Sequence, residues 1–183
     1  MDPAKEDGIA DEALFARMAR RPVVLLGGSH SSAEHHRWQA HAIAALHARI
    51  SNMVLGFEMF PRRVQPILER WVAGSLTREA FLEDVEWGTV WGYDAALYMP
   101  LFDFARMHRL PMVALNVDKA LIARVGKEGW RAIPAGDREG VGDPAPAGPG
   151  YLERLGRTYA AHGEPDAKAP DPDDPDFLRF VEA

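Results

Sequence analysis

The chain has 183 residues, of which 47% are hydrophobic and 26% are charged, and this composition is typical of a globular domain. It contains no cysteine, which excludes a disulfide scaffold, a thiolate metal site and a cysteine nucleophile. The 21 basic and 27 acidic residues give a formal net charge of −6. An acidic chain lacks the basic surface that nucleic-acid binding needs, so we expect no nucleic-acid partner.

The sequence shows neither a membrane span nor a secretory signal. No apolar run approaches the roughly 18 residues that a membrane-spanning helix needs. The first 21 residues are polar and mixed in charge, without the apolar segment of a signal peptide. The sequence as written therefore predicts a cytoplasmic protein, whereas a native form from which a leader has been removed would be periplasmic or membrane-associated.

Three short apolar runs, at residues 23–26, 53–57 and 111–116, predict buried strands. Helical patterns separate these runs, and such alternation predicts a parallel sheet with right-handed crossovers. The expected fold class is thus α/β. We expect a parallel sheet flanked by helices, with a small helical subdomain inserted between the second and third strands.

Capping residues and prolines mark the starts of the predicted helices. Ser31 and Glu34 have the spacing of a capping box, and Thr77, Asp94 and Asp118 precede further helical patterns. Residues 87–93 are aromatic and broken by glycine, so they predict a loop. In chain order, helices are expected at residues 11–20, 31–50, 61 or 66 to 74, 77–84, 94–108, 118–128 and 151–162.

Composition divides the chain into four expected parts. They are an N-terminal helical extension (1–20), an α/β core (21–133) with its helical insertion at about 60–109, a Pro/Gly-rich loop (134–150), and a C-terminal part (151–183). The C-terminal part is expected to contain one helix, an acidic, proline-rich linker at 164–176 that its composition predicts to be disordered, and the truncated start of a final helix at 177–183.

A candidate site follows from the predicted sheet, because ligands of open α/β sheets bind beyond the carboxyl ends of the strands. His30, Glu58 and Asn116 are expected there, one after each strand. Alternatively, Glu58 and Asn116 only cap helices or satisfy loop backbone. Gly27 and Gly28 would let the backbone approach a ligand at a helix N-terminus, but the dinucleotide-binding glycine pattern is absent.

Five of the seven histidines lie between residues 30 and 47, which invites a metal-site hypothesis. Two metal ligands on one helix need a spacing of three or four residues, and no pair has it. His36 and His47 share a helix face but are separated by about 16 Å along the helix axis. The helix histidines are therefore predicted to be mostly surface residues, and His30, which precedes the helix, is the exception.

The aromatic residues allow two interpretations. Trp87, Trp91 and Tyr93 could line a pocket for a flat apolar ligand, but packing of the helical subdomain around them is the favoured alternative. A tyrosine phenolate can also hold ferric haem iron. Of the four tyrosines, Tyr98 is predicted to be buried in a helix, whereas Tyr151 follows the Pro/Gly-rich loop and could reach over a ligand.

Five segments are distinctive: VVLLGGSH (23–30), GFEMFPRRVQPILERWVAGSLTREAFL (56–82), WGYDAALYMPLFDFAR (91–106), LPMVALNVDKALIARVGKEG (110–129) and FLRFVEA (177–183). Together they resemble the ChaN-like haem-binding family of the wider Tiki group, from about residue 21 to the end. The resemblance implies an α/β domain with a smaller helical part. It also implies haem bound at a contact between two subunits, with a tyrosine on the iron and histidine and lysine near the propionates.

Carried onto this sequence, the resemblance points to Tyr151 as the iron ligand, because the family often has a tyrosine opening the helix after its variable loop. Lys119 and His30 are the expected propionate contacts. The other expected cofactor-binding residues are Glu58, Asn116 and Tyr93.

This chain departs from the family pattern at two positions after the first predicted strand. The family usually has glutamate and aspartate where this chain has Gly28 and Ser31. In metal-dependent hydrolases of the wider group, that glutamate and the following histidine contribute to the metal site. Loss of the carboxylate removes a hard ligand and a general base, which weighs against catalysis, so no catalytic residue is expected.

Three functions stay open from the sequence. The first is non-catalytic haem binding in iron or haem acquisition or trafficking. The second is a metal-dependent hydrolase of the Tiki type that uses His30, Glu58 and Asn116. The third is a degenerate member kept for a protein contact.

Overall fold

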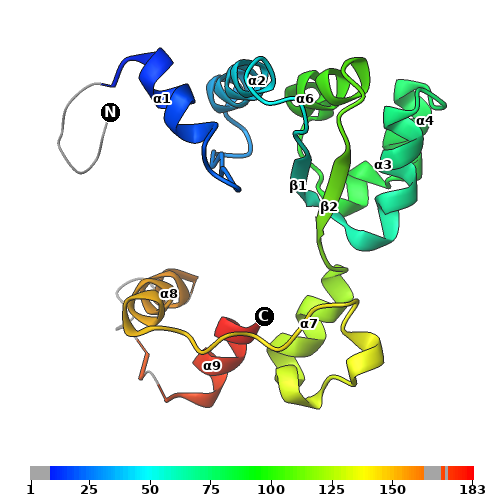
Figure 1. The fold of residues 1–183 in the computed structure, drawn as a ribbon. Coiled ribbons are helices and arrows are strands. Elements are labelled where there is room, and N and C mark those ends of the chain that lie inside the picture. Colours follow the sequence, from blue (N-terminus) through cyan, green and yellow to red (C-terminus); the bar gives the residue numbers. More distant parts are fainter. Residues whose placement is uncertain (1–8, 163–169, 172) are drawn as a thin grey trace. The chain divides into compact units, whose positions relative to one another are not determined.

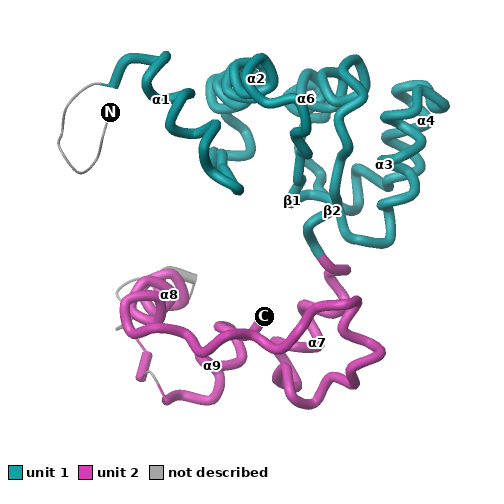
Figure 2. The backbone as a smooth tube through the Cα atoms, in the orientation of Figure 1, with its two compact units in different colours: residues 1–116 teal, residues 117–183 magenta. Residues whose placement is uncertain are grey.

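The computed structural model describes residues 9–162, 170–171 and 173–183. The chain divides into two compact units, unit 1 (Met1–Asn116) and unit 2 (Val117–Ala183), which are coloured separately in Figure 2. Unit 1 contains the sheet, and the described elements of unit 2 are all helical. Each unit is described by itself.

Unit 1 combines a two-stranded parallel sheet with helices (Figure 1). In chain order its elements are α1 (Asp11–Met18), α2 (Ala33–His47), β1 (Leu55–Pro61), a 3-10 turn (Arg62–Val64), α3 (Gln65–Val72), α4 (Arg78–Asp84), α5 (Trp87–Val90), α6 (Ala95–Met107) and β2 (Met112–Asn116). The helices α3 to α6 connect β1 to β2, and α6 packs against α2. This arrangement confirms the predicted α/β class and the helical insertion between the second and third apolar runs.

The sheet has one buried and one exposed face, because buried and exposed side chains alternate along both strands. The buried face carries Leu55, Phe57, Met112 and Ala114. On the other face Val113 and Leu115 are 36% and 56% exposed, and Val54, just before β1, is 54% exposed. Leu115 lies over Gly56, where a Cβ would come within 2.8 Å of its Cδ1. Parallel sheets are normally covered on both faces, so this exposed apolar face is unusual.

An aromatic core lies against the buried face. The rings of Phe60 and Phe81 lie 5.3 and 5.6 Å from the ring of Phe102, and all three side chains are fully buried. Trp71 donates its indole N–H to the carbonyl of Phe102 at 2.9 Å. The guanidinium of Arg106 covers the Trp71 ring at 4.5 Å, as in a cation–π pair. These contacts join α3, α4 and α6 to the sheet.

Gln65 closes the outer edge of β2. Its amide nitrogen donates to the carbonyl of Met112 at 2.9 Å, and its amide oxygen accepts the N–H of Ala114 at 2.9 Å. The side chain therefore makes the two hydrogen bonds that a neighbouring strand would otherwise make. Any further strand of this sheet is expected beside β1, not beside β2.

Replacing Gln65 tests this edge. Gln65→Ala leaves a donor and an acceptor of β2 unpaired, so the free energy of unfolding should fall by about 1–3 kcal/mol. Gln65→Glu should also destabilise the fold, because a carboxylate cannot donate to the carbonyl of Met112. Urea unfolding followed by circular dichroism measures both. The control is Glu69→Ala, which loses only a 3.4 Å contact with Gln65. Equal stability of Gln65→Ala and the control would contradict the interpretation.

The prediction of a strand at residues 23–26 is wrong. The segment forms no strand, and Val23 and Leu25 are 70% and 89% exposed. Leu26 alone packs on the core, and its carbonyl accepts a hydrogen bond from Gln39 at 3.1 Å. An apolar run forms a buried strand only where other elements cover it along its length, and in this run Leu26 is the residue packed on the core.

Two local details also differ from the sequence predictions. Residues 87–93, predicted as a loop, begin with the short helix α5, whose end residues are both buried. Helix α2 is capped by Ser32 and not by Ser31, because the Ser32 hydroxyl accepts the N–H of His35 at 3.3 Å.

Unit 2 consists of helices and the segments between them. Its elements are α7 (Lys119–Glu128), two 3-10 turns (Trp130–Ala132 and Ala135–Asp137), α8 (Pro149–His162) and α9 (Pro175–Glu182). Two small clusters hold it together: Leu121 and Val125 pack with Trp130 and Ile133, and Tyr159 of α8 lies 5.6 Å from Phe177 of α9 between ring centroids. Most of the expected acidic linker, namely residues 164–169 and 172, lies outside the described residues.

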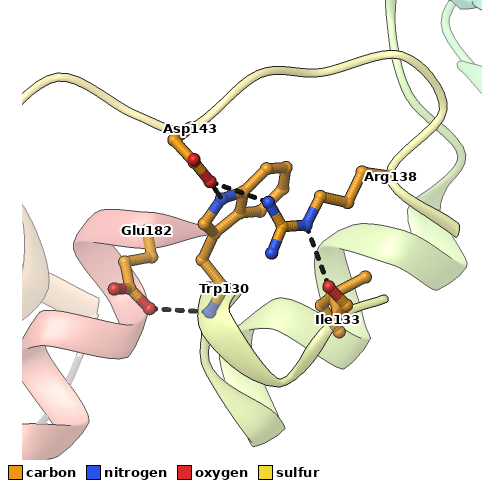
Figure 3. Close-up of polar contacts among 5 residues, drawn as sticks. All are labelled: Trp130, Ile133, Arg138, Asp143 and Glu182. Atoms are coloured by element: carbon orange, nitrogen blue, oxygen red, sulfur yellow. Dashed lines mark hydrogen bonds and ion pairs between the residues drawn. The ribbon is translucent and has the colours of Figure 1, made fainter. Parts of the chain in front are cut away.

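Trp130 organises the segment that follows α7 (Figure 3). Its indole N–H donates to Asp143 at 3.0 Å, and Arg138 donates to the same carboxylate at 2.7 Å and to the carbonyl of Ile133 at 2.9 Å. The guanidinium of Arg138 also covers the indole ring at 4.6 Å. The backbone N–H of Trp130 donates to Glu182 of α9 at 2.8 Å. The hydrogen bonds from Trp130 and Arg138 lower the pKa of Asp143.

The lowered pKa of Asp143 predicts a pH dependence. The stabilising contacts are present above the usual carboxyl pKa of about 3.9 and are lost as pH falls through the lowered value. In NMR spectra the indole N–H signal of Trp130 should shift over this acidic range, and Asp143→Asn should abolish the shift. Asp137→Asn is the control, because Asp137 pairs with Arg124 and not with Trp130. A Trp130 signal that titrates identically in Asp143→Asn would contradict the assignment.

Candidate functional site

The loop that carries His30 is bound by side chains of α2. The N–H of Ser29 donates to Nδ1 of His35 at 2.8 Å, and His36 Nε2 lies 3.1 Å from the carbonyl oxygen of His30. Gly28 lies so close to α2 that a Cβ there would be 3.1 Å from Cβ of His35 and 3.2 Å from Nε2 of Gln39. A glutamate at position 28, as in the family pattern, would need this loop or these side chains to shift.

A second donor reaches the same carbonyl from α6. The Tyr98 hydroxyl donates to the His30 oxygen at 3.1 Å and accepts the indole N–H of Trp91 at 2.8 Å. Burial raises the pKa of Tyr98; the hydrogen bond from Trp91 opposes this, and the charges of Tyr93 and Glu58 add to it. Tyr98 therefore stays a neutral donor, as a buried bridge to the loop requires.

His36 corrects the expectation that the helix histidines are surface residues. It is only 6% exposed, because α2 packs against α6 and the His36 ring lies 4.3 Å from the Tyr98 ring. A carbonyl can only accept, so Nε2 of His36 must carry the proton in this hydrogen bond. Its Nδ1 is buried and has no hydrogen-bond partner among the described residues.

The His30 ring lies beside two aromatic side chains. Its centroid is 4.7 Å from that of Trp91 and 5.1 Å from that of Tyr93, which is 42% exposed. The Trp87 indole N–H donates to the carbonyl of Tyr93 at 2.6 Å and holds this turn. We call His30, Trp91 and Tyr93 the aromatic triplet. It presents an imidazole and a phenol side by side, and solvent reaches both residues.

The other expected site residues occupy three places. Glu58 is exposed in the middle of β1 and not at its end as predicted, and its charge contributes to the raised pKa of Tyr98. Asn116 ends β2 opposite Pro61 of β1. Lys119 begins α7 and Tyr151 lies in the first turn of α8, so both belong to unit 2. The described contacts therefore bring together His30 and Tyr93, and no described contact joins Glu58 to either of them.

Sequence reasoning missed the supporting residues. Tyr98 and Trp91 are seven residues apart, about two helical turns, but the turn between α5 and α6 separates them, so spacing alone did not reveal their hydrogen bond. The sequence predicts His36 to be a surface residue of its helix, and no spacing indicates its hydrogen bond to the loop.

Within the part of the chain that the structure describes, two kinds of feature do not occur. No three histidine, aspartate or glutamate side chains gather so that they could hold a metal ion. No described helix is long and apolar enough to cross a membrane.

Fold and site together define an α/β protein in which an imidazole and an exposed phenol lie side by side, supported by α2 and by the helices inserted between its two strands. The family model described as "Haem-binding uptake, Tiki superfamily, ChaN" matches residues 14–183, so the chain belongs to the ChaN family of the Tiki superfamily. No curated protein and no solved structure matches the chain.

Proposed function

We propose that this protein binds haem without catalysis and serves in the acquisition or trafficking of haem or iron. Membership of a family described by haem-binding uptake supports the proposal. The observation that carries it is the exposed phenol of Tyr93, whose ring lies 5.1 Å from the imidazole of His30.

The residues of the aromatic triplet fit haem in three respects. A tyrosine phenolate is an established ligand of ferric haem iron. The Tyr93 hydroxyl has no hydrogen-bond partner within the described ranges, so it is available to a ligand. The Trp91 and Tyr93 rings offer aromatic surface to a flat macrocycle.

The neighbouring His30 also favours Tyr93 as the iron ligand. A phenol binds iron as the phenolate, so its proton must leave, either to solvent or, after a side-chain rotation that brings the two groups into hydrogen-bond contact, to the neighbouring imidazole of His30. Such neighbours of metal ligands orient the ligand and tune its basicity. When bound, haem would supply the ferric iron that this phenolate holds.

Tyr151, the ligand that the family resemblance favours, has a different environment. It is 48% exposed near the start of α8, and among the described residues no aromatic ring or histidine contacts it. We therefore favour Tyr93 as the iron ligand and keep Tyr151 as the alternative.

The hydrolase alternative gains no support from a specific observation. Position 28, where the family has its glutamate, is packed against His35 and Gln39. His30 and Glu58 have no third acidic or histidine partner that completes a metal-binding group among the residues described.

A hemin titration of the full chain tests the proposal. The absorbance should saturate at about one haem per chain with the spectrum of a ferric tyrosinate complex. Tyr93→Phe should abolish that spectrum and weaken binding at least about tenfold, because it removes only the coordinating oxygen. Tyr151→Phe should leave the spectrum unchanged, as should the control Tyr159→Phe, whose ring packs on Phe177.

Each contrary result has a distinct meaning. A titration that never saturates would refute haem binding. Loss of the tyrosinate spectrum in Tyr151→Phe but not in Tyr93→Phe would refute the choice of ligand alone. Sizing the protein before and after loading tests the expected homodimer, which should form or persist when haem is bound.

A further inference from the structure

We propose that His36 and Tyr98 are positioning residues for His30: two buried donors, one from α2 and one from α6, share its carbonyl oxygen and so hold its imidazole beside Tyr93. The consequence for haem rests on the proposed function. The effect on the position of His30 does not depend on that function.

The carbonyl of His30 is saturated by these two bonds. His36 Nε2 and the Tyr98 hydroxyl each lie 3.1 Å from the oxygen, which has two lone pairs. The donors come from separate helices, so the oxygen is fixed from two directions. The peptide cannot rotate without breaking both bonds.

Breaking the bonds would be costly because the donors are buried. His36 is 6% exposed and Tyr98 is 2% exposed, so water cannot readily replace the lost acceptor. The Tyr98 hydroxyl also accepts from Trp91, and Trp91 is itself a ring neighbour of His30. One hydroxyl therefore locates both the His30 backbone and a side chain that contacts the His30 ring.

The same loop is held one residue earlier by His35, which accepts the N–H of Ser29. The Ser29 carbonyl also accepts the N–H of Ser32 at 3.0 Å, so hydrogen bonds hold the peptide group on each side of the His30 Cα, and rotation of the side chain is its main remaining freedom. The contacts with Trp91 and Tyr93 then limit that rotation. A ligand meets an imidazole already in place, so binding does not have to order the loop.

The test uses two variants that each remove one donor and keep an aromatic ring at the position. Tyr98→Phe deletes the hydroxyl, and His36→Phe deletes the imidazole N–H. His41→Phe is the matched control, because His41 lies on the same helix but contacts Phe15 and Trp38 instead of the loop. Circular dichroism first establishes that each variant is folded.

The first readout is the NMR signal of the His30 ring in protein without hemin. The rings of Trp91 and Tyr93 should shift this signal in the wild type. Tyr98→Phe and His36→Phe should move it toward the position of a free histidine, and His41→Phe should not. A role limited to stability would lower the unfolding midpoint and leave this signal in place, and that result would overturn the proposal.

The second readout is hemin affinity. Tyr98→Phe and His36→Phe should each weaken hemin binding by about three- to tenfold, the range for one hydrogen bond of ordinary strength, and His41→Phe should leave the affinity unchanged. If the wild type binds no hemin and the His30 signal still moves in both variants, positioning is supported and the proposed function fails.

If the variants do not fold, hydrogen exchange in the wild-type protein still tests the proposal. The His36 Nε2–H and Tyr98 O–H protons should exchange slowly with solvent, because both are buried and hydrogen-bonded. Rapid exchange of both protons would overturn the proposal.

Discussion

The hydroxyl of Tyr98 connects the core of unit 1 to its candidate site. The Tyr98 ring packs on Trp87 and Phe102, whereas its oxygen accepts from Trp91 and donates to His30. This hydrogen bond fixes the loop that carries His30 relative to α6, which is itself packed in the core. A site on loops needs such support from rigid elements, because loops alone place side chains less accurately.

The helical insertion between β1 and β2 has two roles. It supplies Trp71, Phe81 and Phe102, which cover one face of the sheet, and also Trp91 and Tyr93, which meet His30. The opposite face of the sheet remains exposed. Because Gln65 closes the outer edge of β2, growth of the sheet is restricted to the side of β1.

Features with a local pattern could be predicted from the sequence. The apolar runs at 53–57 and 111–116 become β1 and β2, and Asp94 caps α6 through the N–H of Ala96. The rule that ligands bind at the carboxyl ends of strands does not account for the positions of His30 and Glu58, because no strand forms before His30 and because Glu58 lies in the middle of β1 and not at its end. The tyrosines are candidate haem ligands because a phenolate can bind ferric iron, and no sequence pattern distinguishes Tyr93 among them.

Features that depend on a tertiary partner could not be predicted. The run at 23–26 is apolar whether or not another element covers it. The burial of His36 depends on the packing of α2 against α6, and the role of Gln65 depends on β2, 47 residues away. The bond between Trp130 and Asp143 likewise joins residues with no periodic relation.

The central claim is that Tyr93, beside His30, is the residue that binds haem iron. A crystal structure of the full chain loaded with hemin tests it most directly. We expect the iron to be bonded to Oη of Tyr93, with the His30 ring beside that oxygen and its carbonyl still bound by His36 and Tyr98. Iron bonded to Tyr151, or to no tyrosine of the chain, would contradict the claim.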